Sequence, residues 1–185
     1  MWSAWKTYAS DMKESPTNRP RELPNQVPRK ASDQVPRYYQ SARSISLIVV
    51  HCTATKPSYD YTKERLRRDH VEGRGWSDIG YHIYVRRNGD IEMCRPLAIP
   101  GAHAKGYNAH SIGIAWEGGL NQLGNTEDNR TAEQAVSLWH VIEDLLIAYP
   151  EARLVGHHDL NPHKACPCMD AANEYKWLVE KYSKR

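Results

Sequence analysis

The sequence from residue 46 onward predicts an α/β domain, and three patterns carry this prediction. Residues 45–51, ISLIVVH, form a continuous apolar and β-branched run, which is typical of a central strand buried on both faces. Residues 80–95, GYHIYVRRNGDIEMCR, have the pattern of a hairpin, with an alternating strand, the turn pair Asn88-Gly89 and a second strand. Segments with the apolar spacing of amphipathic helices lie between and after these strands.

Two elements are expected in the first half of the domain besides the first strand and the hairpin. Residues 61–76, YTKERLRRDHVEGRGW, predict a polar amphipathic helix that ends near Gly73 and Gly75. Residues 111–119, SIGIAWEGG, predict a short strand that is closed by glycines.

The second half of the domain is expected to alternate helix, strand and helix. Thr131 and Gln134 have the spacing of a capping box, and they precede an apolar helical stripe that Pro150 terminates. Residues 152–158, ARLVGHH, predict a last strand, and residues 170–182, DAANEYKWLVEKY, predict a closing helix.

Residues 1–45 differ from the rest of the chain in composition. They contain five of the eleven prolines and eight Lys or Arg against four Asp or Glu, so this segment carries +4 and residues 46–185 carry −1. With few apolar residues, the segment cannot bury enough surface to fold alone. We therefore expect a Pro-rich basic N-terminal extension that is disordered or wraps around the domain of residues 46–185. A second interpretation is a cationic arm that contacts an anionic surface such as a bacterial envelope or nucleic acid.

Length and charge narrow the class of protein. The 185 residues suffice for one domain of ordinary size, and a net charge of +3 does not indicate a general polyanion binder. No run approaches 18 consecutive apolar residues, so we expect no transmembrane segment. The first residues lack an apolar stretch behind a basic one, so we also expect no signal peptide.

Residues 156–171, GHHDLNPHKACPCMDA, concentrate side chains that bind metals. Imidazole and thiolate ligands suit zinc, and a thiolate argues against Mg²⁺ and Ca²⁺. A reducing cytosol would keep the cysteines as thiols, so we expect a thiolate ligand and not a disulfide. A catalytic zinc needs three protein ligands and one open position. The candidates are His51 at the end of the first strand, either His157 or His158, and either Cys166 or Cys168.

Four blocks occur in a recognisable order and spacing across roughly residues 46–180: VHCTATKPS (50–58), GWSDIGYHIYVRRNGDIE (75–92), GAHAKGYNAHSIGI (101–114) and HHDLNPHKACPCMD (157–170). Together they resemble the zinc-dependent N-acetylmuramoyl-L-alanine amidases found among phage lysozyme-amidases and animal peptidoglycan recognition proteins. The resemblance implies a single mixed central β-sheet flanked by helices, with residues 46–185 as the zinc amidase catalytic domain.

The resemblance also implies a set of metal ligands. His51 matches the histidine that ends the first strand, His157 matches the first histidine of the HH pair, and Cys166 matches the cysteine of K-A-C-P. These three side chains would hold one Zn²⁺. His158 and Cys168 would then lie outside the ligand set.

Three further positions match family residues that act near the metal. Tyr81 of GYH would lie near the zinc-bound water, and Lys164 would steady the oxyanion formed on the attacked carbonyl. His103 matches a histidine that lines the substrate cleft. One position departs from another amidase branch, in which a glutamate general base stands where this chain has Ala115. We expect Tyr81 and zinc in place of a carboxylate base, and the identity of the proton acceptor stays open.

The implied function is hydrolysis of the amide between N-acetylmuramic acid and L-alanine of bacterial peptidoglycan, most simply by a phage endolysin. We expect a monomer that is made in the host cytoplasm and reaches the periplasm after a holin permeabilises the membrane. The alternative is a module on the same fold that binds peptidoglycan without catalysis or regulates a phage RNA polymerase. Non-catalytic members typically lose the ligand cysteine, whereas Cys166, Lys164 and Tyr81 are all present here.

Overall fold

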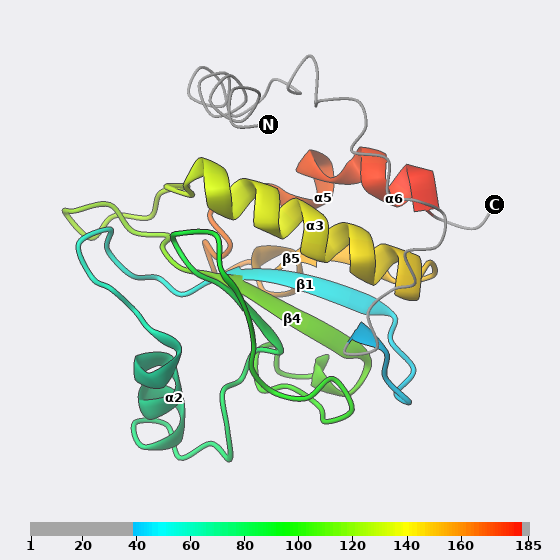
Figure 1. Cartoon of the computed structure of the whole chain (residues 1–185), viewed down its shortest axis with the longest axis horizontal. Coiled ribbons are helices and arrows are strands. Elements are labelled where there is room, and N and C mark those ends of the chain that lie inside the picture. Colours follow the sequence, from blue (N-terminus) through cyan, green and yellow to red (C-terminus); the bar gives the residue numbers. More distant parts are fainter. Residues whose placement is uncertain (1–38, 183–185) are drawn as a thin grey trace.

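The computed structural model describes residues 39–182, and within them a five-stranded mixed sheet forms the centre of the domain (Figure 1). The strand order is β3-β2-β4-β1-β5, with β2, β4, β1 and β5 parallel and β3 antiparallel to β2. The predicted single mixed sheet is therefore confirmed. The strands are β1 (Leu47–Cys52), β2 (Ile83–Val85), β3 (Ile91–Met93), β4 (Ser111–Trp116) and β5 (Arg153–Gly156).

Successive side chains of β1 and β4 point to opposite faces of the sheet, and both faces are buried. On one face Ile48, Val50 and the alternate residues of β4 join the main hydrophobic core. On the other face lies His51, which is paired in register with Ala115. The apolar run therefore forms a central strand as predicted, and its one histidine points away from the main core.

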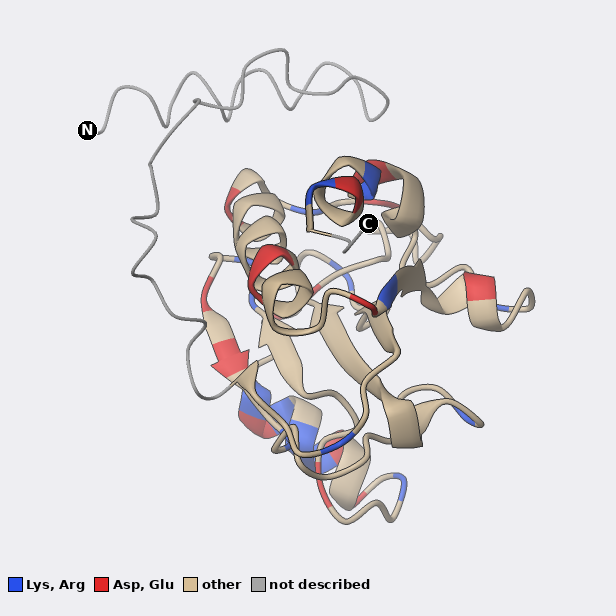
Figure 2. Ribbon diagram, turned by 90° about the vertical axis from the view of Figure 1, so that its right-hand side faces the viewer, with Lys and Arg blue, Asp and Glu red and all other residues tan. Residues whose placement is uncertain are grey.

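Helices cover both faces of the sheet (Figure 1). The long helix α3 (Ala132–Ala148) packs on the main core, and the short helices α5 (Ala171–Glu174) and α6 (Lys176–Tyr182) lie beside it. The helix α2 (Lys63–Val71) lies on the opposite side, and its Leu66 packs under the sheet. Lys and Arg gather on α2, whereas β1 and β4 carry no Lys, Arg, Asp or Glu (Figure 2).

The capping box predicted from the sequence is confirmed, whereas the last predicted strand is shorter than expected and the closing helix is divided. The capping box is present, with Thr131 Oγ1 accepting from the Gln134 amide and the Gln134 side chain accepting from the Thr131 amide. The strand β5 ends at Gly156, so the two histidines after it begin the short helix α4 (His157–Leu160) instead of prolonging the strand. The closing helix is interrupted at Tyr175.

The residues just before β1 pack on the domain. Tyr39 is 2% exposed and belongs to the main core. The guanidinium of Arg43 donates to four backbone carbonyls, those of Leu97, Asn108, Ala109 and Ser111. The rest of the expected extension, residues 1–38, lies outside the described residues. Among residues 39–182, no helix is both long and apolar enough to cross a membrane.

Candidate metal centre and adjoining cavity

Three of the sequence-predicted residues come together at the end of β1. One ligand atom each from His51, His157 and Cys166 lies within 4.8 Å of the other two. The rings of His51 and His157 are 4.5 Å apart between centroids, and the Nδ1 atom of His51 is 3.7 Å from the Cys166 sulfur. These are the three residues that the family resemblance selected.

The loop that carries Cys166 is attached to the ends of β1 and β5. The Cys166 sulfur accepts a hydrogen bond from the Cys52 amide at 3.2 Å, and the Cys166 carbonyl accepts one from the His158 amide at 2.8 Å. Gly156 makes this approach feasible, since a Cβ at that position would lie 2.8 Å from Pro167 Cδ. The ligand loop and the strand end are therefore held together before any metal binds.

Both histidines of the cluster are held in their neutral forms. Burial lowers the pKa of His51 well below its ordinary value, and the neighbouring His103 and His157 lower it further. The pKa of His157 is lowered by burial and then by the charge of Lys164. Neutral imidazoles and a thiol that ionises on metal binding form a donor set that fits zinc.

Tyr81 faces the same cluster. Its ring centroid lies 5.2 Å from that of His51, and burial raises its pKa above the ordinary value for a phenol. Tyr81 therefore stays protonated near neutral pH and offers a hydroxyl donor beside the ligands. The position opposite His51 on β4 is Ala115, which is fully buried against Tyr84, so the carboxylate of the other amidase branch has no counterpart there.

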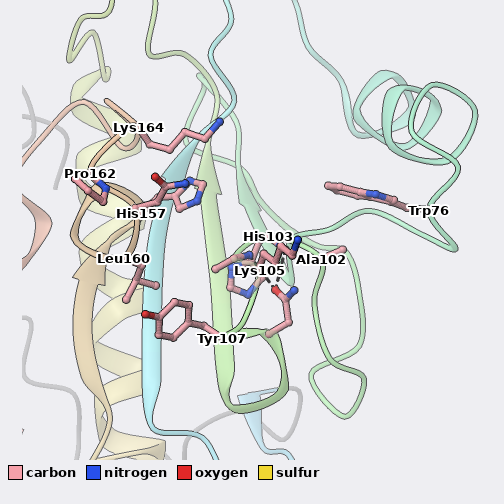
Figure 3. Close-up of a pocket in the computed structure, with 12 residues that line it drawn as sticks. Trp76, Ala102, His103, Lys105, Tyr107, His157, Leu160, Pro162 and Lys164 are labelled. Carbon is pink, nitrogen blue, oxygen red and sulfur yellow. Dashed lines mark hydrogen bonds between the residues drawn. The ribbon is translucent and has the colours of Figure 1, made fainter.

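The cluster borders a cavity of about 620 Å³ (Figure 3). His157 and Lys164 lie on one side of it, and His103 and Lys105 lie on the other. Lys164 is exposed, whereas His103 is only 8% exposed. Because His157 is both a candidate ligand and part of the lining, the candidate metal centre borders the cavity. A catalytic zinc site needs such access to solvent for its open coordination position.

The two residues left outside the predicted ligand set have other contacts. His158 Nε2 lies 3.2 Å from a carboxylate oxygen of Asp159. The Cys168 sulfur lies 3.7 Å from the Cys52 sulfur and donates to the Gly119 carbonyl at 3.4 Å.

Sequence reasoning missed several residues that the structure places at the site. Trp76, Tyr107 and Leu160 line the cavity, and Ser111 contacts His103 from β4. Trp76 and Tyr107 stand inside the blocks that carry the family resemblance, so their position within GWSD and KGYN was the available signal. Ser111 also stands in one of these blocks, GAHAKGYNAHSIGI, but its contact with the His103 ring depends on how that block folds.

Comparison with known proteins shows the family of this chain. The family described as N-acetylmuramoyl-L-alanine amidase matches residues 41–169. The endolysin of Enterobacteria phage K11 is 40% identical over 132 residues, which are 71% of this chain and 86% of that protein. The solved amidase LysC from Clostridium intestinale is 31% identical with a TM-score of 0.61, covering 77% of this chain and 88% of that one.

A more distant structure supports the fold alone. Drosophila PGRP-LB has a TM-score of 0.61 at 23% identity, over 74% of this chain and 83% of that one. The expected fold and enzyme class are therefore confirmed. With its matching family profile, its endolysin relatives and its cluster of two histidines and a cysteine, this chain belongs to the N-acetylmuramoyl-L-alanine amidase family.

Proposed function

We propose that this amidase is a zinc enzyme that works as a phage endolysin. Its reaction is hydrolysis of the amide between the lactoyl group of N-acetylmuramic acid and the L-alanine of the stem peptide. One observation carries the proposal: the neutral His51, His157 and the Cys166 thiol meet at the edge of a cavity large enough for part of a glycopeptide. The names of the phage relatives support the endolysin role.

His51, His157 and Cys166 would hold the zinc. Bound there, zinc would supply Lewis-acid activation of water and of the substrate carbonyl. The two neutral imidazoles leave the ion with net positive charge, because only the thiolate offsets it.

Tyr81 and Lys164 are proposed to act on the substrate. The protonated Tyr81 side chain, whose ring lies 5.2 Å from that of His51, would serve as a hydrogen-bond donor to the substrate or to water beside the ligands. The Lys164 ammonium lies at the edge of the cavity beside His157, where a positive charge stabilises the oxyanion that forms at the attacked carbonyl. His103, on the other side, is proposed to line the substrate cleft.

Glu117 is a poor candidate for the proton acceptor, because its carboxylate already accepts three hydrogen bonds. One oxygen accepts from the Tyr61 amide, and the other accepts from Arg86 and from the Arg87 amide. The side chain is 2% exposed. We propose that the proton leaves through groups that face the cavity and not through this carboxylate.

The cellular setting follows from the endolysin role. We propose that the protein is a monomer made in the host cytoplasm and acts in the periplasm after a holin opens the membrane. The basic segment 1–45 would contact the anionic envelope on the way. Sedimentation of the full chain with anionic vesicles at low and high salt tests this contact, since added salt should release the protein.

The reaction is tested by digestion of purified peptidoglycan with product identification by mass spectrometry. The expected products are free stem peptides that begin at L-alanine, and EDTA and the Cys166→Ser substitution should both abolish them. Cys94→Ser is the matched control, because Cys94 is a free thiol outside the ligand cluster. Intact stems from folded, zinc-loaded protein would overturn the proposal, and bound but uncleaved peptidoglycan would then favour a binding module.

A further inference from the structure

We infer that His103 is a positioning residue for the metal ligand His51, and that Ser111 positions His103 in turn. This inference rests on the proposed zinc site. It gives His103 a role in orienting His51, beyond lining the cavity. It also adds Ser111 to the residues on which zinc binding depends.

The contacts form a chain that leads away from the metal centre. His51 presents Nδ1 to the Cys166 sulfur at 3.7 Å and Nε2 to the Nδ1 atom of His103 at 3.0 Å. The Nε2 atom of His103 then lies 3.2 Å from Ser111 Oγ. His51 and Ser111 are 1% and 0% exposed, so no solvent competes for these bonds at either end of the chain.

A metal held by His51 Nδ1, the atom that faces the Cys166 sulfur, would fix where the hydrogens lie along these contacts. A neutral imidazole that uses Nδ1 as a ligand carries its hydrogen on Nε2, so His51 donates to His103 Nδ1. His103 must then carry its own hydrogen on Nε2, from which it donates to the Ser111 hydroxyl. An acceptor at His103 Nδ1 therefore selects the His51 tautomer whose free lone pair faces the other two ligands.

The position of the His103 ring is set by close backbone approach on two sides. A Cβ at Gly113 would lie 2.6 Å from His103 Cγ, and a Cβ at Gly101 would lie 2.4 Å from its Cδ2. The side-chain oxygen of Asn108 also accepts hydrogen bonds from the backbone amides of His103 and Ala104, at 3.0 and 2.9 Å. The imidazole thus occupies a slot that only glycines leave open, with its Nδ1 directed at His51.

A second buried histidine offers a matched control. His82 is fully buried near His103, with ring centroids 5.6 Å apart. Its Nδ1 atom accepts a hydrogen bond from the Gly113 amide, and its Nε2 atom lies 3.1 Å from the Ile99 carbonyl oxygen. No contact joins His82 to His51 in the described part of the chain. Its removal should weaken the fold without changing the tautomer of the ligand.

The test measures the zinc dissociation constant of the full chain by competition with a chromophoric chelator. Partners that orient metal-bound histidines typically contribute about 10- to 100-fold in affinity. We expect His103→Leu to weaken zinc binding by about that factor. His103→Asn, which keeps an acceptor near the Nδ1 position, should restore most of the loss. Ser111→Ala should weaken binding by about three- to tenfold, at or below the lower end of that range.

The control separates the inference from general damage to the core. His82→Leu should lower the Tm of the metal-free protein and leave the zinc dissociation constant near that of the parent. The inference is overturned if His103→Leu binds zinc as the parent does, or if His82→Leu loses as much affinity as His103→Leu. Since Ser111→Ala removes a single atom, parent-like binding by that variant would refute the second link even where His103→Leu does not fold.

The parent protein distinguishes failure of the inference from failure of the proposed function. If the parent protein binds no zinc, both the positioning role and the proposed zinc-dependent function are refuted. A parent that binds zinc tightly, with His103→Leu unchanged in affinity but raised in KM for peptidoglycan fragments, overturns only the positioning role. That result would leave His103 as a substrate contact.

Discussion

Replacing Glu117 by Gln should destabilise the fold while leaving the chemistry intact. The carboxylate lies just after β4, two residues beyond the position at which another amidase branch carries its general base. It accepts from the Tyr61 amide at 2.8 Å, from Arg86 Nε at 2.8 Å and from the Arg87 amide at 3.0 Å. A glutamine keeps only one acceptor oxygen and turns an NH₂ group toward a donor.

The magnitude follows from these contacts. Breaking a buried ion pair costs about 3–5 kcal/mol. The guanidinium of Arg86 also contacts Asp60 and Glu92 and its side chain is 18% exposed, so it retains partners and the cost should lie near 3 kcal/mol. For a domain of this size, 1 kcal/mol shifts Tm by roughly 2–4 °C, so a decrease of about 6–12 °C is expected.

Urea denaturation and turnover at low temperature are the two assays. Glu151→Gln, at an exposed glutamate, is the control and should leave the free energy of unfolding unchanged within about 0.5 kcal/mol. A loss below about 1 kcal/mol for Glu117→Gln would refute the structural role. Turnover per folded molecule should stay within about threefold of the parent, a change of less than 1 kcal/mol in the barrier. A drop of more than about 100-fold in folded, zinc-loaded protein would instead identify Glu117 as the proton acceptor.

Three more outcomes are expected. Thr131→Ala should lower the free energy of unfolding, measured in urea, by about 1–2 kcal/mol. The substitution removes the cap on the Gln134 amide and a 2.7 Å hydrogen bond to a backbone carbonyl of the β2–β3 turn. An unchanged free energy of unfolding would contradict this. Burial lowers the pKa of His82 to about 4, so the folded state binds fewer protons than the unfolded state below pH 6.5. Stability should therefore fall by up to about 3 kcal/mol between pH 6.5 and 4, and Tm against pH should be flatter for His82→Gln. Cys168→Ser should keep zinc affinity within about threefold of the parent in the chelator assay, because the Cys168 thiol faces Cys52 and not the ligands. A tenfold loss would show that Cys168 supports the metal.

Local sequence signals predicted most of the elements because their causes are local. The β-branched run formed β1, the Asn88-Gly89 pair turned the hairpin, and Thr131 with Gln134 capped α3. Each depends on residues within a few positions of one another. The end of β5 was harder to predict. Nothing in the local sequence decides whether the two histidines after Gly156 continue the strand or begin a short helix, as they do here.

Sequence by itself determined which donor atoms are available and which family they match. Two histidines, a cysteine, a lysine and a tyrosine in the right blocks were enough to nominate the metal ligands and the two residues proposed to act on the substrate. Only the tertiary structure decided how these groups are oriented. The ring of His51 meets that of His103, 52 positions away along the chain, because β1 and β4 are neighbours in the sheet and glycines on both sides admit the second ring. A hydrogen bond between such distant residues depends on strand register and backbone approach, and neither is encoded in the spacing of the residues that form it.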